Sequence, residues 1–150
     1  MFRGNHHYVV DDKGRVAIPA RFREALSGLQ DERLVVTKFK RRGKPCLDVY
    51  PLSTWTHLVE RIREKKRFGR KLGAFESWYV SAAQDTQIDA QGRMVIPPML
   101  REYAELGREV VFAGVTDKFR IWNKELFHQV DREDEREVFE DPGLLDELEL

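Results

Sequence analysis

Two short polar loops, each ending in an arginine, are the segments of this chain best suited to chemistry. Residues 11–15 (DDKGR) return as residues 89–93 (DAQGR). An arginine can donate two parallel hydrogen bonds to O6 and N7 of a guanine, whereas phosphate contacts supply affinity without sequence information. The loops therefore predict a DNA-binding site in which Arg15 and Arg93 read bases, with Lys13 and Gln91 at the loop tips.

The acidic and glycine positions of these loops are expected to be structural. Asp11 and Asp89 are placed to cap the turn or to pair with the arginine that follows, and Gly14 and Gly92 adopt a positive φ at no steric cost. One alternative is that Arg15 and Arg93 also serve only to hold the turns. The tips differ, since Lys13 suits a phosphate and Gln91 a hydrogen bond, so equal roles are not expected.

The similarity extends beyond the loops into a duplicated unit. Seven of fourteen positions are identical between residues 11–24 and residues 89–102, including the pairs Arg23 with Arg101 and Glu24 with Glu102. A duplicated short unit usually completes its core against its own copy. The chain is therefore expected to form one pseudo-symmetric body that presents two equivalent arginine loops.

Each half is predicted to follow the order β-β-α-β-β-α. Alternating apolar residues and turn residues indicate strands at 8–10, 15–18, 34–39, 46–50, 110–114 and 119–122, with 8–18 as a hairpin-like unit and 40–45 as a basic turn. Helices are indicated with Pro19 as the first helical residue, from Pro97-Pro98, from Ser53 or Thr54, over 68–79 and from 127 to about 140, with Ser27-Gly28 and Gly107 as stops. The acidic end beyond residue 140 is expected to fray.

Charge is segregated along the chain, although the formal net charge is zero. Residues 1–75 carry 18 Lys and Arg against 8 Asp and Glu, and residues 76–150 carry 8 against 18, so the halves bear +10 and −10. This asymmetry indicates a basic surface for nucleic acid, a complementary contact between halves or subunits, or both. The turn at 40–42 is interpreted as a solvated tip or a DNA backbone contact, and the basic run 61–67 as a subunit contact or a DNA contact.

Composition argues against several other functions. No apolar run approaches the roughly 20 residues that span a bilayer, and no secretory segment is visible, so a cytoplasmic, nucleoid-associated protein without a membrane partner is expected. Cys46 is interpreted as a small buried residue. No cofactor or metal is predicted, because the four histidines, His6, His7, His57 and His128, lack ligand spacing. No nucleophile set, phosphate loop or catalytic carboxylate pair indicates an enzyme.

Several motifs together resemble the MraZ family of bacterial transcriptional regulators. They are the start Met1-Phe2-Arg3-Gly4, the two boxes DDKGRVAIP and DAQGRMVIP, and the closing Arg120-Ile121-Trp122. The resemblance implies a mixed α+β, mainly β fold of two tandem swapped-hairpin (AbrB-type) units in one pseudo-symmetric barrel with flanking helices. The expected divisions are residues 1–54 for the first repeat, 55–80 for connecting helices, 81–126 for the second repeat, and 127–150 for a helix and acidic tail.

The family resemblance also implies the biological role. It implies a ring-like homo-oligomer that binds double-stranded DNA with short direct repeats, at the promoter of its own cell-division and cell-wall operon. Arg3, with Asn5, His6 and His7, forms either a second basic surface near the loops or an exposed segment. The alternative function is a protein-interaction or scaffold module that uses the barrel and the acidic tail.

Overall fold

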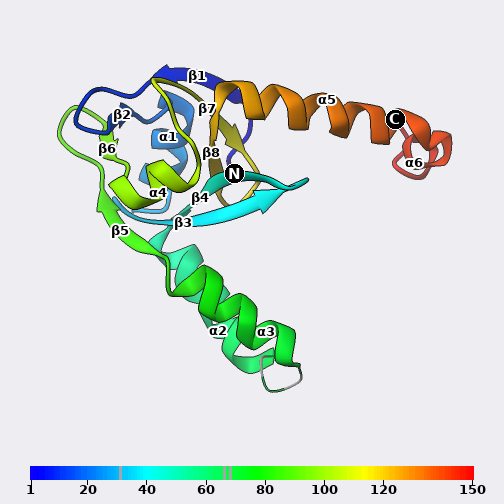
Figure 1. The fold of residues 1–150 in the computed structure, drawn as a ribbon, viewed down its shortest axis with the longest axis horizontal. Coiled ribbons are helices and arrows are strands. Elements are labelled where there is room, and N and C mark those ends of the chain that lie inside the picture. The colour runs from blue at the N-terminus through cyan, green and yellow to red at the C-terminus, as the bar shows by residue number, and fades with distance from the viewer. Residues whose placement is uncertain (31, 66, 68) are drawn as a thin grey trace.

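The fold is a central antiparallel sheet with helices around it, from which two helical segments project (Figure 1). The computed structural model describes residues 1–30, 32–65, 67 and 69–150. The helices and strands are, in order, β1 (Asn5–Val9), β2 (Arg15–Ala17), α1 (Ala20–Gly28), β3 (Arg33–Arg41), β4 (Lys44–Pro51), α2 (Leu52–Lys65), α3 (Arg70–Phe75), η2 (Glu76–Val80), β5 (Gln84–Gln87), β6 (Arg93–Val95), α4 (Pro98–Tyr103), β7 (Glu109–Gly114), β8 (Phe119–Asn123), α5 (Lys124–Glu140) and α6 (Pro142–Glu147).

This order confirms the predicted β-β-α-β-β-α arrangement of each half. The first half runs from β1 to α2 and the second from β5 to α5, with α3 and η2 between them. The six-stranded sheet has the order β1-β7-β8-β4-β3-β5, and β2 and β6 form a separate two-stranded sheet. The fold is therefore mixed α+β and built from two tandem repeats.

The predicted hairpin over residues 8–18 is wrong, because its two strands pair with the other repeat. β1 pairs with β7, β2 with β6, and β5 with β3, all antiparallel. Two backbone bonds close the turn itself, from Asp11 N to Arg15 O (2.9 Å) and from Gly14 N to Asp11 O (3.0 Å). The alternation of apolar residues indicates strands but does not specify which strands pair. The pairing between the two repeats therefore could not be predicted from the local sequence.

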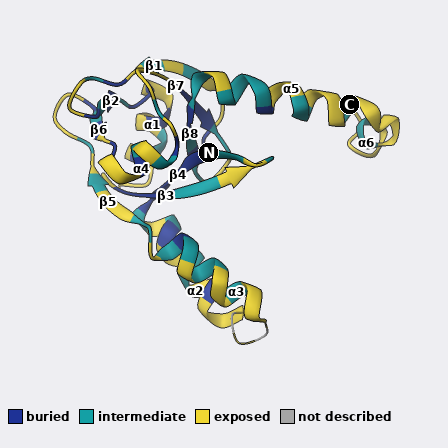
Figure 2. Cartoon of the chain, in the orientation of Figure 1, coloured by how far each residue is buried: buried dark blue, intermediate teal, exposed yellow. Residues whose placement is uncertain are grey.

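The predicted pseudo-symmetric barrel is not closed. Among the described residues, β1 and β5 are the two ends of the six-stranded order and are not paired with each other. The strands between them, β7, β8, β4 and β3, enclose the main core together with α1 and α4. Its centre is aromatic, with the rings of Phe22 and Phe119 4.9 Å apart and Phe2 packed edge-on against both. Figure 2 shows this buried centre.

The helix ends differ in detail from the predictions. Pro19 is the N-cap of α1 rather than its first helical residue, whereas Pro97-Pro98 opens α4 as predicted, with Pro97 as the N-cap and Pro98 as the first helical residue. After α4 the positive φ falls at Glu105 (55°) instead of Gly107. α2 begins at Leu52, ahead of the predicted cap at Ser53 or Thr54. Beyond residue 140 the chain forms α6, whose first turn is capped by the Asp141 carboxylate, so the predicted fraying is wrong there.

The segment between the repeats is helical, as predicted, although Phe68 lies outside the described residues. α2 descends from the sheet, and α3 with η2 returns beside it, forming a helical arm (Figure 1). Trp55 and Tyr79 close the base of this helical arm against β3 and β4, with their rings 5.8 Å apart. The exposed end of the helical arm projects away from the sheet (Figure 2).

The basic β3–β4 turn does not stand free in solvent. It is a two-residue turn with positive φ at Arg42 (52°) and Gly43 (74°), as in a type I′ hairpin. Arg41 Nη2 and Arg42 Nε each donate to Asp134 Oδ1 of α5 at 2.6 Å, and Arg42 also pairs with Glu137. These ion pairs raise the pKa of Arg42, chiefly through the hydrogen bond to Asp134. The turn therefore makes a charge-complementary contact between the two halves of the chain.

Candidate nucleic-acid interface

Each predicted loop is a closed turn built around one carboxylate. In the first loop, Asp11 Oδ1 accepts hydrogen bonds from the backbone N–H groups of Lys13 and Arg15, both at 2.9 Å. Asp11 Oδ2 accepts from Arg15 Nε at 2.7 Å. Gly14, with φ +80°, donates its N–H to the Asp11 carbonyl at 3.0 Å. The carboxylate therefore orders both the turn and the arginine side chain.

The second loop repeats this geometry. Asp89 Oδ1 accepts from the backbone N–H groups of Gln91 and Arg93 at 2.9 Å, and Oδ2 accepts from Arg93 Nε at 3.0 Å. Gly92 has φ +76° and donates to the Asp89 carbonyl at 3.0 Å. Because the two loops share the same bonds, the sequence duplication corresponds to a structural duplication.

The hydrogen bonds favour the charged form of both carboxylates. The pKa of Asp11 is lowered, first by the backbone N–H of Arg15 and then by the Arg15 side chain and the backbone N–H of Lys13, while partial desolvation opposes the shift. The pKa of Asp89 is lowered in the same way by Arg93 and Gln91. Both loops are therefore held by ionised aspartates at neutral pH.

The two arginines emerge from one face of a two-stranded ribbon. β2 and β6 are antiparallel, with Arg15 opposite Val95 and Ala17 opposite Arg93. Directly opposed residues share a face, so Arg15 and Arg93 lie on the same face as diagonal neighbours. Val16 and Met94, between them, are buried on the other face. The ribbon is thus anchored by its apolar face and presents both arginines outward.

The guanidinium groups keep donors available on this face. Among the described residues, the hydrogen bonds of the Arg15 and Arg93 side chains are made by Nε to Asp11 and Asp89. The two Nη atoms of each guanidinium are left to bind a second group. Two parallel N–H donors match the O6 and N7 acceptors of guanine.

The other predicted contact residues lie at different places. Lys13 and Gln91 are exposed at the two loop tips. Arg3 is exposed too, but it lies before the start of β1, where its backbone packs against Gly114 of β7. The five residues of β1, a rise of about 16 Å, separate Arg3 from the first loop. The structure therefore brings the loop residues together and leaves Arg3 apart.

The histidines near Arg3 do not form a single basic surface. The His6 ring packs edge-on against Phe22, and its buried Nε2 has no hydrogen-bond partner among the described residues. His7 is exposed and stacks on His128 of α5, with the ring centres 5.8 Å apart. Across the described part of the chain, no three metal-ligating side chains gather. Cys46 is fully buried in β4, as predicted, and desolvation raises its thiol pKa.

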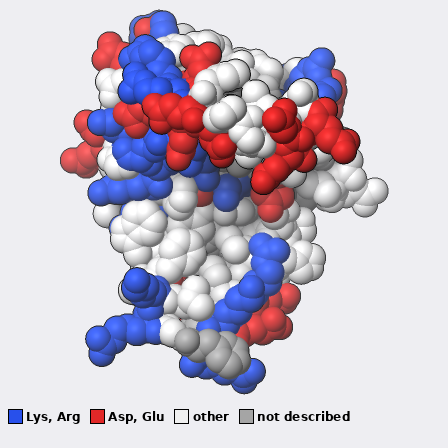
Figure 3. Space-filling model, turned by 90° about the vertical axis from the view of Figure 1, so that its right-hand side faces the viewer, with Lys and Arg blue, Asp and Glu red and all other residues white. Residues whose placement is uncertain are grey.

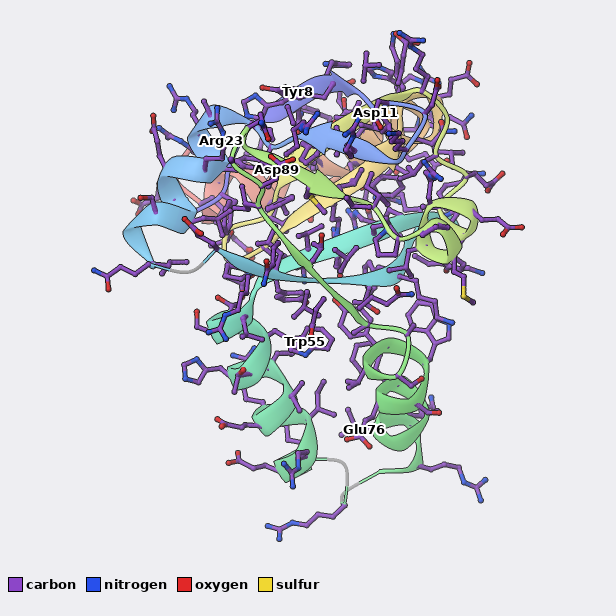
Figure 4. The ribbon with its side chains drawn as sticks, turned by 90° about the vertical axis from the view of Figure 1, so that its left-hand side faces the viewer. Tyr8, Asp11, Arg23, Trp55, Glu76 and Asp89 are labelled. Carbon is purple, nitrogen blue, oxygen red and sulfur yellow. The ribbon has the colours of Figure 1, made fainter. Side chains whose placement is uncertain are left out.

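Sequence reasoning missed two further arginines that support the loops. Arg23 of α1 reaches the second loop (Figure 4), where its Nη1 would lie 2.8 Å from a Cβ at Gly92. Arg101 of α4 reaches the first loop, where its Nη1 would lie 2.8 Å from a Cβ at Gly14. Each also lines a hollow beside the loop it contacts. Their identity in the two repeats was the signal that could have indicated this role.

The loops are also joined to each other by the backbone. Ile18 N donates to Gly92 O at 3.0 Å, and Ile96 N donates to Gly14 O at 2.8 Å. Each loop is thus held by residues of both repeats.

None of the helices in the described part of the chain has the length and apolar character needed to cross a membrane.

Comparison with known proteins identifies the family. The family model described as "MraZ protein" matches residues 1–72 and 80–143. A protein of Acidithiobacillus ferrooxidans, named transcriptional regulator MraZ, is 41% identical over 125 residues, covering 82% of this chain and 83% of its own. Proteins of the same name from Moorella thermoacetica and Pseudomonas aeruginosa are 38% and 34% identical over 133 and 148 residues, covering 89% and 99% of this chain and 88% and 97% of their own.

The relatives agree with the expectation that the chain is not an enzyme, because they are named as transcriptional regulators. A solution structure of a Pyrococcus horikoshii protein covers 81% of this chain and 88% of its own, with a TM-score of 0.35 and 14% identity, which is too distant to define the fold. The sequence matches and the two structurally equivalent loops together show that this chain belongs to the MraZ family.

Proposed function

We propose that this protein is a DNA-binding transcriptional regulator that reads its operator with the β2–β6 ribbon. The observation that carries the proposal is the shared outward face of Arg15 and Arg93 above the buried Val16 and Met94. A two-stranded ribbon fits the major groove of B-DNA. Diagonal neighbours on such a ribbon are about 7–8 Å apart, which matches roughly two base-pair steps.

The aspartates prepare the arginines for this contact. Each Nε is bound by its carboxylate, so the side chain is held before DNA arrives and loses less conformational freedom on binding. The Nη donors of each arginine then bind a guanine, and Lys13 contacts a neighbouring phosphate. Arg3 lies one strand length away from the first loop. It contacts the DNA backbone either farther along the same duplex or where a neighbouring subunit is bound.

One ribbon contacts only a short stretch of DNA, so assembly supplies the remaining affinity. In the proposed ring-like homo-oligomer, neighbouring copies present ribbons to short direct repeats in the promoter of the protein's own cell-division and cell-wall operon. Linking several weak contacts raises the overall affinity by effective concentration. Such a protein is associated with the nucleoid.

The test is a titration of promoter DNA and a shuffled sequence with wild type and two double variants. In R15A/R93A, specific binding is lost, by about 5- to 150-fold for each bidentate contact removed. In R15K/R93K the positive charge remains, so binding to shuffled DNA is kept, while the preference for the promoter falls because lysine cannot donate the planar pair.

The matched control is R21A/K40A, which removes two exposed cations that lie outside the β2–β6 ribbon, the helical arm and α5, and leaves promoter binding unchanged. Unchanged promoter affinity in R15A/R93A would overturn the proposal and favour the scaffold function. A binding partner captured equally by wild type and R15A/R93A would be the positive sign of that alternative.

A further inference from the structure

Two oppositely charged projections leave the body of this chain without reaching each other. One is the helical arm formed by α2, α3 and η2. The other is the tail, defined here as residues 131–150, which holds the outer part of α5 and all of α6. In Figure 1 the helical arm and the tail run away from the sheet in different directions. We propose that the helical arm of one copy docks on the tail of a second copy, so that copies join head to tail.

The helical arm carries a concentrated positive charge. Its described and exposed cations are Arg61, Arg63, Lys65, Arg70 and Lys71. Figure 3 shows blue side chains projecting from this end of the molecule. Arg61 and Lys65 are four residues apart on α2, so they lie on one face of the helix.

The tail carries the matching negative charge. It contains ten Asp and Glu against two Arg. Asp134 and Glu137 are bound to the β3–β4 turn of the same chain, which leaves eight acidic residues outside that contact. Figure 3 shows red side chains gathered on the upper part of the same face. The two halves of the chain therefore carry complementary charges, but only some of these charges pair with each other within one chain.

Apolar side chains accompany the acidic ones. Phe139, Leu148 and Leu150 are 69%, 61% and 86% exposed. Exposed apolar residues grouped on a projecting element are typical of an interaction surface between proteins. Charge then supplies orientation and encounter rate, while apolar contact supplies affinity.

The position of the helical arm favours a second copy over DNA. Figure 4 shows the helical arm, marked by Trp55 and Glu76, at the opposite end of the molecule from Asp11 and Asp89. A duplex on the β2–β6 ribbon therefore lies away from the helical arm. Glu60 and Glu64 also interrupt its basic residues, which suits a protein partner better than a phosphate backbone.

A contact between two different surfaces is heterologous, and such contacts close into rings when the rotation between copies permits. The inference thus rests on the proposed oligomer and assigns the surfaces that build it. The tail variant does not touch the loops, so the assembly can be tested separately from DNA reading.

The experiment exchanges charges between the two surfaces and measures molar mass by light scattering during size-exclusion chromatography. Wild type gives a multiple of the 17.7 kDa chain at low salt, and its mass falls in 1 M salt as the ion pairs are screened. R61E/K65E and E140K/E147K each elute near the mass of one chain. The variant carrying all four changes regains assembly, as does an equimolar mixture of the two double variants.

The matched control is R21E/R108E, which reverses two exposed charges on the body and keeps the wild-type mass. Circular dichroism checks that every variant is folded. A wild-type mass for R61E/K65E, or no rescue by the four-fold variant, overturns the inference. Loss of promoter binding by R61E/K65E at unchanged mass assigns the helical arm to DNA instead. A wild-type protein of 17.7 kDa overturns the oligomer itself and leaves the DNA-reading proposal to its own test.

Discussion

The guanidinium of Arg101, in the second repeat, lies against Gly14, in the first. A Cβ on Gly14 would stand 2.8 Å from Arg101 Nη1 and 3.2 Å from the carbonyl oxygen of Ile96. Arg23 and Gly92 repeat the relationship in the other direction. Each arginine loop is therefore held by an arginine of the other repeat. A change in one repeat is expected to affect the DNA-contacting loop of the other.

Replacing Gly14 with alanine is expected to destabilise the protein. Its φ of +80° costs an L-residue about 1–2 kcal/mol, and the new methyl group must also displace Arg101. Denaturant unfolding should show a loss of at least about 1 kcal/mol. Gly73→Ala is the control, because Gly73 is helical and, among the described residues outside its own helix backbone, no atom lies within 4 Å of its Cβ position. It should be neutral or stabilising by up to about 1 kcal/mol; equal losses at both positions would contradict the account.

The two loop tips should differ in the salt dependence of promoter binding. Lys13 can neutralise a phosphate, whereas Gln91 is uncharged. Lys13→Ala should therefore reduce the slope of log affinity against log salt by about 1, because one fewer counterion is released. Gln91→Ala should leave that slope unchanged. The same slope for Lys13→Ala and wild type would remove Lys13 from the phosphate contacts.

Acid should remove the stabilisation that Asp11 and Asp89 provide. The folded protein lowers the pKa of both groups below 3.8, so their contribution is present above that value and is lost as the pH falls through the folded-state pKa. Melting temperatures of wild type and D11N/D89N should differ by a constant gap between pH 5 and 8, which closes below about pH 3.8. Asp12→Asn is the control, since no hydrogen bond of Asp12 occurs among the described residues. A gap that persists at low pH would show that the carboxylate charge is not what holds the turns.

The sequence predicted the elements better than their partners. The strands at 34–39 and 46–50 are confirmed within β3 and β4, because runs of apolar residues between turn signals depend on local pattern alone. The pairing of β1 with β7 and of β2 with β6 is a long-range choice that such patterns do not encode. The segregation of charge is evident in the sequence. The ion pair between Arg42 and Asp134 could not be predicted from it, because that pair depends on where α5 lies in the fold.

In the candidate site, too, some features could be predicted from the local sequence and others depend on long-range pairing. The roles of Asp11 and Asp89 in closing their turns follow from side-chain chemistry at short spacing, and the structure shows the expected bonds. The support that Arg23 and Arg101 give to the opposite loops depends on the exchange between repeats. The shared face of Arg15 and Arg93 likewise depends on the register of β2 against β6.

A buried polar network joins the helical arm to the sheet, and its central hydroxyl should matter for stability. Asp48 is fully buried and accepts from Arg120 Nε at 2.8 Å and from the Tyr79 hydroxyl at 2.5 Å. The hydroxyl of Tyr79 also lies 2.7 Å from that of Tyr50. Burial, reinforced by the negative charge of Asp48, raises the pKa of Tyr79, so the hydroxyl stays protonated and remains a donor.

Tyr79→Phe should therefore cost about 1–3 kcal/mol in the free energy of unfolding, because a buried carboxylate loses a donor. Tyr103→Phe makes the same chemical change at a buried hydroxyl that has no partner among the described residues, and it should be neutral or slightly stabilising. Because Tyr79 belongs to η2, its loss should also speed hydrogen exchange at the base of the helical arm more than in the β2–β6 ribbon. Equal stability of the two tyrosine variants would show that the Asp48 network does not fasten the helical arm to the sheet.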